Sequence, residues 1–178
     1  AVTAPRGALR IHVRPGATRL TAELSVRSLG PRLQTCTLSL ASRPAHSWRH
    51  KWADRTSLQA AEELTGPSLP YFLDPNGNVA ETSRGNLFVL CHDDVWRTPP
   101  ATDWVLPGVT RRALLDQFGD RDVPHEIAPL TAADLTDARS VVWTSSLSGA
   151  VQVSEIDGRQ IQGSADEVSW VAPALTLV

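Results

Sequence analysis

The sequence predicts a single α/β domain rich in β-hairpins, and three observations lead to that fold class. Short apolar runs, several of them alternating with polar residues, recur along the chain in the pattern of half-buried strands. Glycine, proline and asparagine separate many of these runs and are typical of tight turns. Two longer stretches carry apolar residues at helical spacing, so the 178 residues mix strands and helices within one domain of ordinary size.

The first 50 residues are predicted to form strands and loops. Residues 9–13 alternate between apolar and polar side chains, and Pro15-Gly16 ends that strand with a turn. Residues 32–40 also alternate, with Cys36, Leu38 and Leu40 on the apolar side. A proline in the segment 42–44 closes this second strand.

A helix and a hairpin are expected next. Residues 53–64 are rich in helix formers, and Gly66-Pro67 stops the helix. The apolar runs 69–73 and 79–82 flank a turn that contains Asn76-Gly77. An Asn-Gly pair supplies the positive φ angles of a tight hairpin turn, so the two runs are predicted to pair.

The second half continues the alternation of strands and helices. Residues 86–91 form an apolar run typical of a buried strand, and 95–98 its short return strand. A helix is predicted from 107 to about 118, with Val109, Leu114, Leu115 and Phe118 on one side. The remaining expected elements are strands at 123–128, 141–144 and 151–156, and a short helix at 131–135 with Thr131 as its N-cap.

Composition excludes several classes of function. The formal net charge is −2 and no basic face is evident, which argues against nucleic-acid binding. No run of 18 apolar residues occurs, so we expect no membrane-spanning helix. Cys36 and Cys91 lie in apolar runs and are expected to be free thiols of a cytoplasmic protein that lacks a signal peptide. The sequence does not begin with methionine, and we treat its start as incomplete.

Lys51 is the only lysine in the chain, where every other permanently cationic side chain is arginine. A guanidinium stays charged, whereas a desolvated lysine amine can lose its proton and condense with a carbonyl. The alternative is an accident of an arginine-rich composition. The residues around position 51 are therefore needed to distinguish a functional amine from an accident of composition.

Three further features carry chemistry that Lys51 would need. They are the acid Glu81 at a strand end, the helix start at 108–110, and the polar pair Ser145-Ser146 after a buried strand. Each also has an ordinary interpretation, as a solvated acid, a helix terminus or a strand end. Taken together, an amine, a carboxylate and a phosphate site are the three groups that pyridoxal phosphate requires.

The chain resembles the class IV aminotransferases, the fold-type IV pyridoxal phosphate enzymes. This family includes branched-chain aminotransferases, D-amino-acid aminotransferases and 4-amino-4-deoxychorismate lyase. The resemblance extends from about residue 8 to residue 160. The segments that carry it are His50-Lys51-Trp52-Ala53-Asp54-Arg55, Glu81-Thr82-Ser83-Arg84-Gly85-Asn86-Leu87-Phe88, Thr98-Pro99 and Leu106-Pro107-Gly108-Val109-Thr110-Arg111.

The resemblance assigns roles to individual residues. Lys51 matches the lysine that forms the Schiff base with the cofactor, and Glu81 matches the acid that pairs with the pyridine nitrogen. The phosphate contacts are matched by Val109 and Thr110, and by Ser145 or Ser146 with the register open by one residue. Arg55 matches an arginine of the lyase branch, would lie one helical turn from Lys51, and supports either the cofactor site or only the fold.

The resemblance also implies a fold and an activity. Residues 1–178 match the large domain of the D-amino-acid aminotransferase-like enzymes, a hairpin-rich pseudobarrel flanked by helices, and the family's small N-terminal domain is absent from this chain. We expect a homodimer and a small-molecule amino substrate. Thr56 replaces the tyrosine of the branched-chain enzymes, which together with Arg55 favours aminodeoxychorismate lyase, giving 4-aminobenzoate and pyruvate.

Other functions remain open on the sequence. A branched-chain or D-amino-acid aminotransferase is one alternative, and a catalytically silent lobe that serves dimerisation or binding is another. His46 and His50 have a spacing that suits a metal on a helix, but Pro44 makes a helix there doubtful and no acid pattern accompanies them. We therefore expect no metal site.

Overall fold

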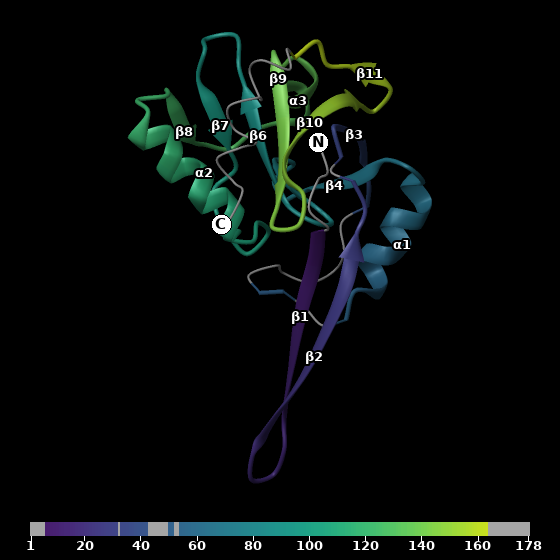
Figure 1. The fold of residues 1–178 in the computed structure, drawn as a ribbon. Helices are drawn as coiled ribbons and strands as arrows, with labels where there is room; N and C mark the ends of the chain where they lie inside the picture. Colours follow the sequence, from purple (N-terminus) through teal and green to yellow (C-terminus); the bar gives the residue numbers. More distant parts are fainter. Residues whose placement is uncertain (1–5, 32, 43–49, 52–53, 164–178) are drawn as a thin grey trace. The chain divides into compact units, whose positions relative to one another are not determined.

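The computed structural model describes residues 6–31, 33–42, 50–51 and 54–163. The chain divides into two compact units, Ala1–Arg32 and Leu33–Val178. The first unit is a long hairpin and the second holds all the helices and the remaining strands of the described residues (Figure 1).

The first unit pairs β1 (Arg6–Pro15) with β2 (Leu20–Leu29) in antiparallel register. The turn between them is closed by a hydrogen bond from the Gly16 N–H to the Arg19 carbonyl at 2.9 Å. This confirms the strand predicted at 9–13 and its turn. The partner strand was not predicted, although residues 20–26 alternate as a strand should.

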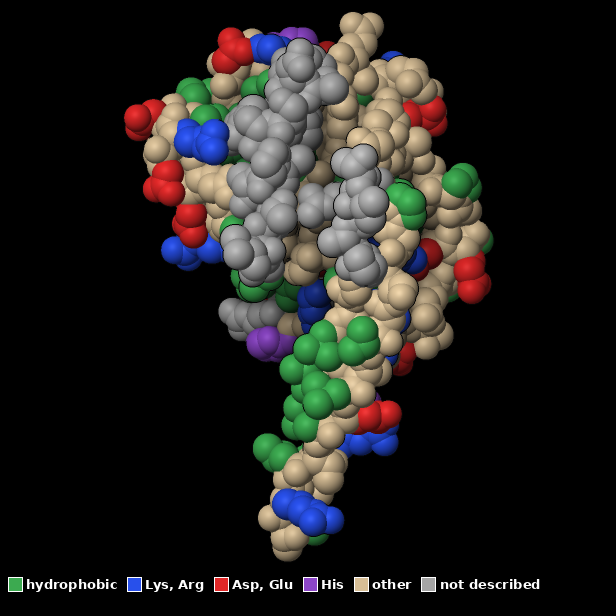
Figure 2. All heavy atoms as spheres, viewed as in Figure 1, with side chains coloured by type: hydrophobic (Ala, Val, Ile, Leu, Met, Phe, Trp, Pro, Cys, Tyr) green, Lys and Arg blue, Asp and Glu red, His purple; other side chains and the backbone are tan. Residues whose placement is uncertain are grey.

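The hairpin has one apolar face that is exposed within the described residues. Leu9, Ile11 and Val13 are 62%, 59% and 53% exposed, and their cross-strand partners are Val26, Leu24 and Ala22. Because side chains alternate along a strand, the polar residues of both strands lie on the opposite face. Figure 2 shows the hydrophobic side chains gathered along this hairpin.

The second unit is built on one mixed sheet. Its strands run in the order β5-β4-β3-β10-β9-β6-β7-β8, and β11 pairs with β10. The pairs β3–β10, β3–β4 and β7–β8 are parallel and the others antiparallel. The bounds are β3 (Thr35–Leu40), β4 (Leu69–Leu73), β5 (Val79–Thr82), β6 (Asn86–Leu90), β7 (Trp96–Thr98), β8 (His125–Ile127), β9 (Ser140–Ser145), β10 (Gly149–Ile156) and β11 (Arg159–Gln160).

The sheet has to curl because of one short connection. Strands β5 and β6 are five places apart in the sheet, yet only residues 83–85 join them. Five strand spacings span about 24 Å in a flat sheet. Four residue steps reach about 14 Å at most. The curl brings the end of β5 beside the start of β6, and this junction carries Glu81 and Asn86.

Helices cover both faces of the curled sheet. The bounds are α1 (Thr56–Thr65), α2 (Val109–Asp120) and α3 (Ala132–Thr136). Strand β6 shows the layering: Leu87 and Val89 pack with Leu135 of α3, whereas Phe88 and Leu90 pack with Leu114 and Phe118 of α2. Because both faces are covered, β6 is apolar throughout after Asn86, as in a fully buried strand.

Most sequence expectations for this unit are confirmed. The hairpin around Asn76-Gly77 forms, and Gly77 has a φ of +83°. Thr131 caps α3 in a capping box with Asp134. The described residues leave Cys36 and Cys91 as free thiols, both half-buried. None of the helices in the described segments has the length and apolarity of a membrane span.

Two helix expectations are wrong in detail. Helix α1 begins at Thr56 rather than 53, where Asp54 Oδ1 accepts from the Thr56 N–H at 2.9 Å. Lys51 and Arg55 therefore do not lie one helical turn apart. Val109 is 71% exposed and does not belong to the buried side of α2, since it is the first helical residue and projects beyond the sheet contact. His46, Trp48, Trp52 and Trp170 lie outside the described residues.

Candidate active site

Glu81 is the centre of a buried polar cluster at the junction of β5 and β6. Its side chain is only 7% exposed, and its Oε2 accepts two hydrogen bonds. One comes from Asn86 Nδ2 at 2.8 Å and the other from the Leu106 N–H at 3.0 Å. Among the described residues no donor reaches Oε1, so one oxygen is fixed and the other is left for a partner.

Burial raises the pKa of Glu81 to about 8, because a charged carboxylate is poorly solvated there. The Leu106 N–H and the positive charges of Lys51 and Arg111 act in the opposite direction without cancelling the effect of burial. A carboxyl with this pKa holds its proton at neutral pH. It can therefore share a proton with a basic ring nitrogen.

Lys51 lies close enough to Glu81 for its charge to lower the pKa of that carboxyl. The charge of Lys51 thus acts on Glu81, but no hydrogen bond or ion pair joins the two side chains within the described part of the chain. The Lys51 side chain itself is exposed, so the desolvated amine anticipated from the sequence is not found in the described part of the chain. Lys51 itself belongs to neither a helix nor a strand.

The start of α2 is joined directly to the Glu81 cluster. Asn86 Nδ2 also donates to the Leu106 carbonyl, at 3.0 Å, so Asn86 connects Glu81 to the loop before the helix. Gly108 is the N-cap, with an ordinary φ of −65°. Its role is steric, because a Cβ there would lie 2.2 Å from Asn86 Oδ1.

The predicted phosphate contacts are partly brought together. Thr110 Oγ1 and Ser146 Oγ lie 3.5 Å apart, although they are 36 residues apart in sequence. Ser145 instead accepts from the Ser148 N–H at 3.2 Å, so it closes the turn after β9. Gly108 has no side chain to accept from the first-turn amides of α2, and such N–H groups favour an anion. Val109 can contribute only its backbone N–H, because its side chain is apolar and has no hydrogen-bond donor.

Arg111 is a buried cation that the sequence argument quoted but gave no role. It is 6% exposed and donates to Thr98 Oγ1 at 3.3 Å and to the Pro99 carbonyl at 2.9 Å. Its charge also lowers the pKa of Glu81. Asn86 was missed in the same way. The signal for both was their place inside the two segments that carry the family resemblance.

Arg55 lies in an ion-pair network instead of contacting the predicted phosphate residues. Its Nη2 donates to Glu62 Oε1 and to the Ser83 carbonyl, both at 3.2 Å. These bonds connect the start of α1 to the turn between Glu81 and Asn86. Arg55 thereby supports the frame of the cluster.

The residues of this cluster fit pyridoxal phosphate. The buried Glu81 offers one unoccupied oxygen and a proton to a ring nitrogen, and Lys51 offers an amine nearby. The Thr110 and Ser146 hydroxyls meet at the start of α2, where an anion is favoured. All five residues that define this arrangement, Asn86 included, belong to one compact unit.

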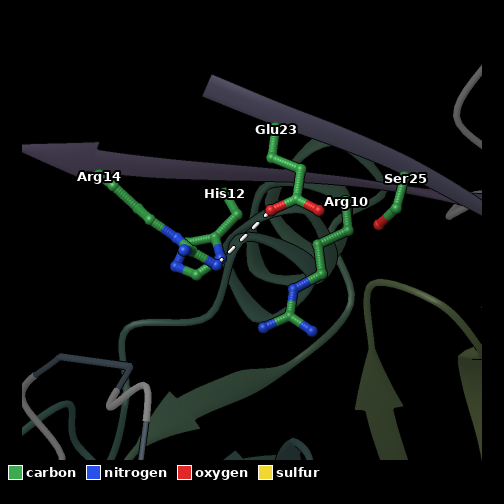
Figure 3. A pocket seen from close by; sticks show the side chains of 5 residues that line it. All are labelled: Arg10, His12, Arg14, Glu23 and Ser25. Atoms are coloured by element: carbon green, nitrogen blue, oxygen red, sulfur yellow. Dashed lines mark ion pairs between the residues drawn. The ribbon is translucent and has the colours of Figure 1, made fainter. Parts of the chain in front are cut away.

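The polar face of the hairpin forms a separate pocket in the first unit (Figure 3). It is lined by Arg10, His12 and Arg14 of β1 and by Glu23 and Ser25 of β2. Arg14 and Glu23 form an ion pair at 3.5 Å with both side chains more than 60% exposed. None of these residues was predicted to belong to a site.

Comparison with known proteins gives a family match over most of the chain. The sequence model of the family described as "Amino-transferase class IV" matches residues 6–156. The "Putative branched-chain-amino-acid aminotransferase" of Methanocaldococcus jannaschii is 33% identical over 91 residues, which cover 51% of this chain and 31% of that protein. The D-alanine aminotransferase of Bacillus licheniformis is 29% identical over 90 residues, covering 51% and 31%. The matched part is thus about a third of these relatives.

Solved structures share the fold over nearly the whole chain. A hypothetical aminotransferase from Mycobacterium tuberculosis, in its PLP-bound form, has a TM-score of 0.79 at 21% identity and covers 95% of this chain and 66% of that one. The "Putative 4-amino-4-deoxychorismate lyase" of Legionella pneumophila has a TM-score of 0.72 at 20% identity and covers 91% and 65%. The predicted pseudobarrel fold is confirmed by these likenesses.

Proposed function

The chain belongs to the class IV aminotransferase family, and on that premise we propose that it forms the cofactor-binding part of a pyridoxal phosphate enzyme acting on a small amino substrate. The observation that carries the proposal is the buried carboxyl of Glu81, held on one oxygen by Asn86 and Leu106, with the Lys51 charge nearby. A solvated strand acid would need none of these contacts.

Each residue of the cluster has a distinct task in this proposal. When bound, pyridoxal phosphate withdraws electrons from the substrate α-carbon, which is the chemistry that this family uses. The Lys51 amine would hold the cofactor aldehyde and move the proton at the α-carbon. Glu81 would place its free oxygen against the ring nitrogen, and the charge of Arg111 would offset that of the buried carboxylate.

The phosphate group is assigned to the start of α2. Thr110 and Ser146 supply hydroxyl donors, and the first-turn amides supply N–H groups, including that of Val109. Ser145 is assigned no contact because its hydroxyl already closes a turn. Lys51 is exposed, so the cofactor and substrate themselves have to supply the desolvation that lowers the barrier to proton loss.

For the specific reaction we propose aminodeoxychorismate lyase activity, which releases 4-aminobenzoate and pyruvate. The support is the resemblance at Arg55 and the absence of the branched-chain tyrosine at Thr56. This activity needs no second substrate to accept the amino group. Release of pyruvate in the absence of any 2-oxo acid is therefore the result that supports it.

A branched-chain or D-amino-acid aminotransferase is the second candidate, and the curated relatives favour it, because those named above are aminotransferases. Such an enzyme would release no pyruvate from aminodeoxychorismate. It would instead move the amino group of a branched-chain amino acid or D-alanine to an added 2-oxo acid. The same preparation can be assayed for both reactions.

A catalytically silent lobe is the remaining alternative. We propose a cytoplasmic homodimer by analogy with the family, and light scattering gives the mass that tests it. Stable dimers that take up no cofactor would favour the silent lobe. Stable dimers that take up cofactor would support the enzyme.

Cofactor uptake tests the proposal as a whole. Pyridoxal phosphate added to the purified protein should produce a visible absorbance band in the wild type. The band should be absent in Lys51→Arg, which keeps the charge and removes the amine. The control is Arg112→Lys, which adds an amine on the exposed side of α2 and should leave the band unchanged. Equal spectra for wild type and Lys51→Arg would remove the proposal.

A further inference from the structure

The start of α2 has no side-chain cap of its own. Gly108 occupies the N-cap position, so no N-cap side chain accepts from the first-turn N–H groups. The first turn also carries no acidic residue that would stabilise the positive end of the helix. A helix end of this kind tends to fray, because its first N–H groups have no partner within the helix. Contacts from outside the helix therefore have to keep this turn in one place.

Arg111 makes such a contact from within the first turn. Its side chain is buried and donates from Nε to Thr98 Oγ1 at 3.3 Å and from Nη2 to the Pro99 carbonyl at 2.9 Å. Arg111 directly follows Thr110, whose hydroxyl is assigned to the cofactor phosphate. The contact is therefore made one residue away from the candidate phosphate site.

Thr98 is itself fixed by the sheet. It is only 1% exposed, and its Oγ1 donates to the Leu87 carbonyl of β6 at 2.8 Å while it accepts from Arg111. One hydroxyl can make both bonds, because it has one donor and two acceptor positions. The Thr98 carbonyl accepts from the Ala128 N–H, just after β8, at 3.1 Å. Thr98 thus connects the first turn of α2 to β6 and to the end of β8.

Two prolines restrict the backbone that carries both acceptors of Arg111. Thr98 is followed by Pro99 and Pro100. A residue before a proline is restricted to extended backbone, and a proline fixes its own φ angle. Thr98 and Pro99 each precede a proline, so the Thr98 hydroxyl and the Pro99 carbonyl are presented by a stiff segment. The Thr98-Pro99 pair, which carries part of the family resemblance, is therefore a preformed acceptor for Arg111.

We propose that Thr98 is a positioning residue that holds the phosphate-binding start of α2 in place through Arg111. The inference rests on the proposed function, in which Thr110 and the first-turn amides bind the cofactor phosphate. Thr98 itself needs no contact with the cofactor. Loss of its hydroxyl would leave the buried Nε–H of Arg111 without an acceptor, and the first turn of α2 would open more often.

Hydrogen exchange in the cofactor-free protein tests the effect on the helix. The Arg112 N–H donates to the Gly108 carbonyl at 3.0 Å in the first turn of α2, so its exchange rate reports opening of that turn. In Thr98→Val we expect this amide to exchange about tenfold faster, the factor that one hydrogen bond to a charged group supplies. Thr98→Ser keeps the hydroxyl and should exchange as the wild type does. Equal rates in wild type and Thr98→Val, or the same acceleration for every amide of α2, would overturn the proposal.

Cofactor binding tests the effect on the phosphate site. Thr98→Val should bind pyridoxal phosphate about tenfold more weakly than the wild type, because the first turn no longer stays in place. Its affinity for pyridoxal, which lacks the phosphate, should change little. A hydroxyl that only stabilises the fold would change both affinities by the same factor, and that result would contradict the proposal.

A matched control comes from α3, which packs on the opposite face of β6 from α2. The Thr136 hydroxyl donates to the Ala132 and Ala133 carbonyls at 3.3 and 3.1 Å. Thr136→Val makes the same substitution as Thr98→Val and should leave the exchange of Arg112 and both affinities unchanged. Changes of equal size in the two variants would show that Thr98 has no special place.

Arg111→Lys separates the contact from the charge. Lysine keeps the positive charge but loses the Nε donor to Thr98. Exchange of the Arg112 amide should quicken as in Thr98→Val, and the double variant should be no faster than the faster single variant, because both remove one contact. Hydrogen exchange alone is used here, because the new amine can react with the cofactor aldehyde. Additive effects would contradict the proposal. If Thr98→Val fails to fold, a wild-type rate in Arg111→Lys overturns it.

The two measurements keep this inference distinct from the proposed function. If the wild type binds no pyridoxal phosphate, the proposed function fails. The exchange of Arg112 then still decides whether Thr98 holds the first turn of α2. If the wild type binds the cofactor and Thr98→Val binds it equally well, the proposed function stands and the role of Thr98 is refuted.

Discussion

Asn86 holds Glu81 from the next strand, with Nδ2 lying 2.8 Å from the carboxyl Oε2. The same amide nitrogen donates to the Leu106 carbonyl, and its Oδ1 lies against Gly108. One buried side chain thus positions the acid, the loop and the helix start. The curl of the sheet makes this contact, because it brings the end of β5 beside the start of β6.

Replacing Asn86 with alanine should loosen all three elements. Glu81 would lose a buried hydrogen bond and the Leu106 carbonyl a partly buried one, and we expect about 1–3 kcal/mol less stability by urea denaturation. Cofactor affinity should fall as well. Asn78→Ala removes a half-buried amide that bonds Asp74 at 3.3 Å in a turn, and serves as the control. Equal stability in the two variants would mean that Asn86 does not hold the acid, the loop and the helix start together.

Gly108→Ala should be destabilising for a steric reason. A methyl group there would meet Asn86 Oδ1 at 2.2 Å, so the amide or the helix start has to shift, at a cost of about 1–3 kcal/mol. Gly119→Ala, in the same helix with open space around it, should stabilise the protein by up to about 1 kcal/mol. Thermal melting of the two variants checks the prediction. Movement of both in the same direction would contradict it.

The elements that could be predicted are those whose sequence pattern is local. The hairpin at Asn76-Gly77 and the buried strand of β6 follow from turn chemistry and apolar runs, which depend on neighbouring residues only. The role of Asn86 depends on the curl of a whole sheet. No local pattern encodes that contact, so Asn86 was missed even though its segment had been singled out.

The contacts of long side chains are the second feature that could not be predicted from the sequence. A helix was predicted from residue 53, with Lys51 and Arg55 one helical turn apart, but the helix begins at Thr56, where the Asp54 side chain accepts from the Thr56 N–H. Arg55 reaches the Ser83 carbonyl, and the Lys51 side chain is exposed. The desolvation of the Lys51 amine depends on groups that are distant in sequence or bound to the protein. The residues next to Lys51 in the sequence do not specify those groups.

The stability of the cofactor-free protein should depend on the proton of Glu81. Its folded pKa of about 8 exceeds the ordinary value of 4.5, so the folded state binds the proton more tightly than the unfolded chain does. Stability contributed in this way is complete below about 4.5 and is lost as the pH rises towards 8. Glu81→Gln should flatten that part of the profile. Urea midpoints measured between these pH values check it, and identical slopes for both proteins would contradict it.

The phosphate assignment predicts a difference between two ligands. Thr110→Val and Ser146→Ala should each weaken the binding of pyridoxal phosphate, because each removes a hydroxyl donor at the start of α2. Binding of pyridoxal, which lacks the phosphate, should change little. Ser145→Ala is the matched control and should leave both affinities unchanged. If Ser145→Ala has the larger effect, the register of the two serines has been assigned wrongly.

The most direct test of the central claim uses the fact that the chain has one lysine. The protein is incubated with pyridoxal phosphate and reduced with borohydride, and its peptides are mapped by mass spectrometry. The account predicts one pyridoxyl group, on Lys51, and reduced labelling in Glu81→Gln at limiting cofactor. Labelling confined to the terminal amine of the chain, or equal labelling of Lys51 in wild type and Glu81→Gln, would contradict it.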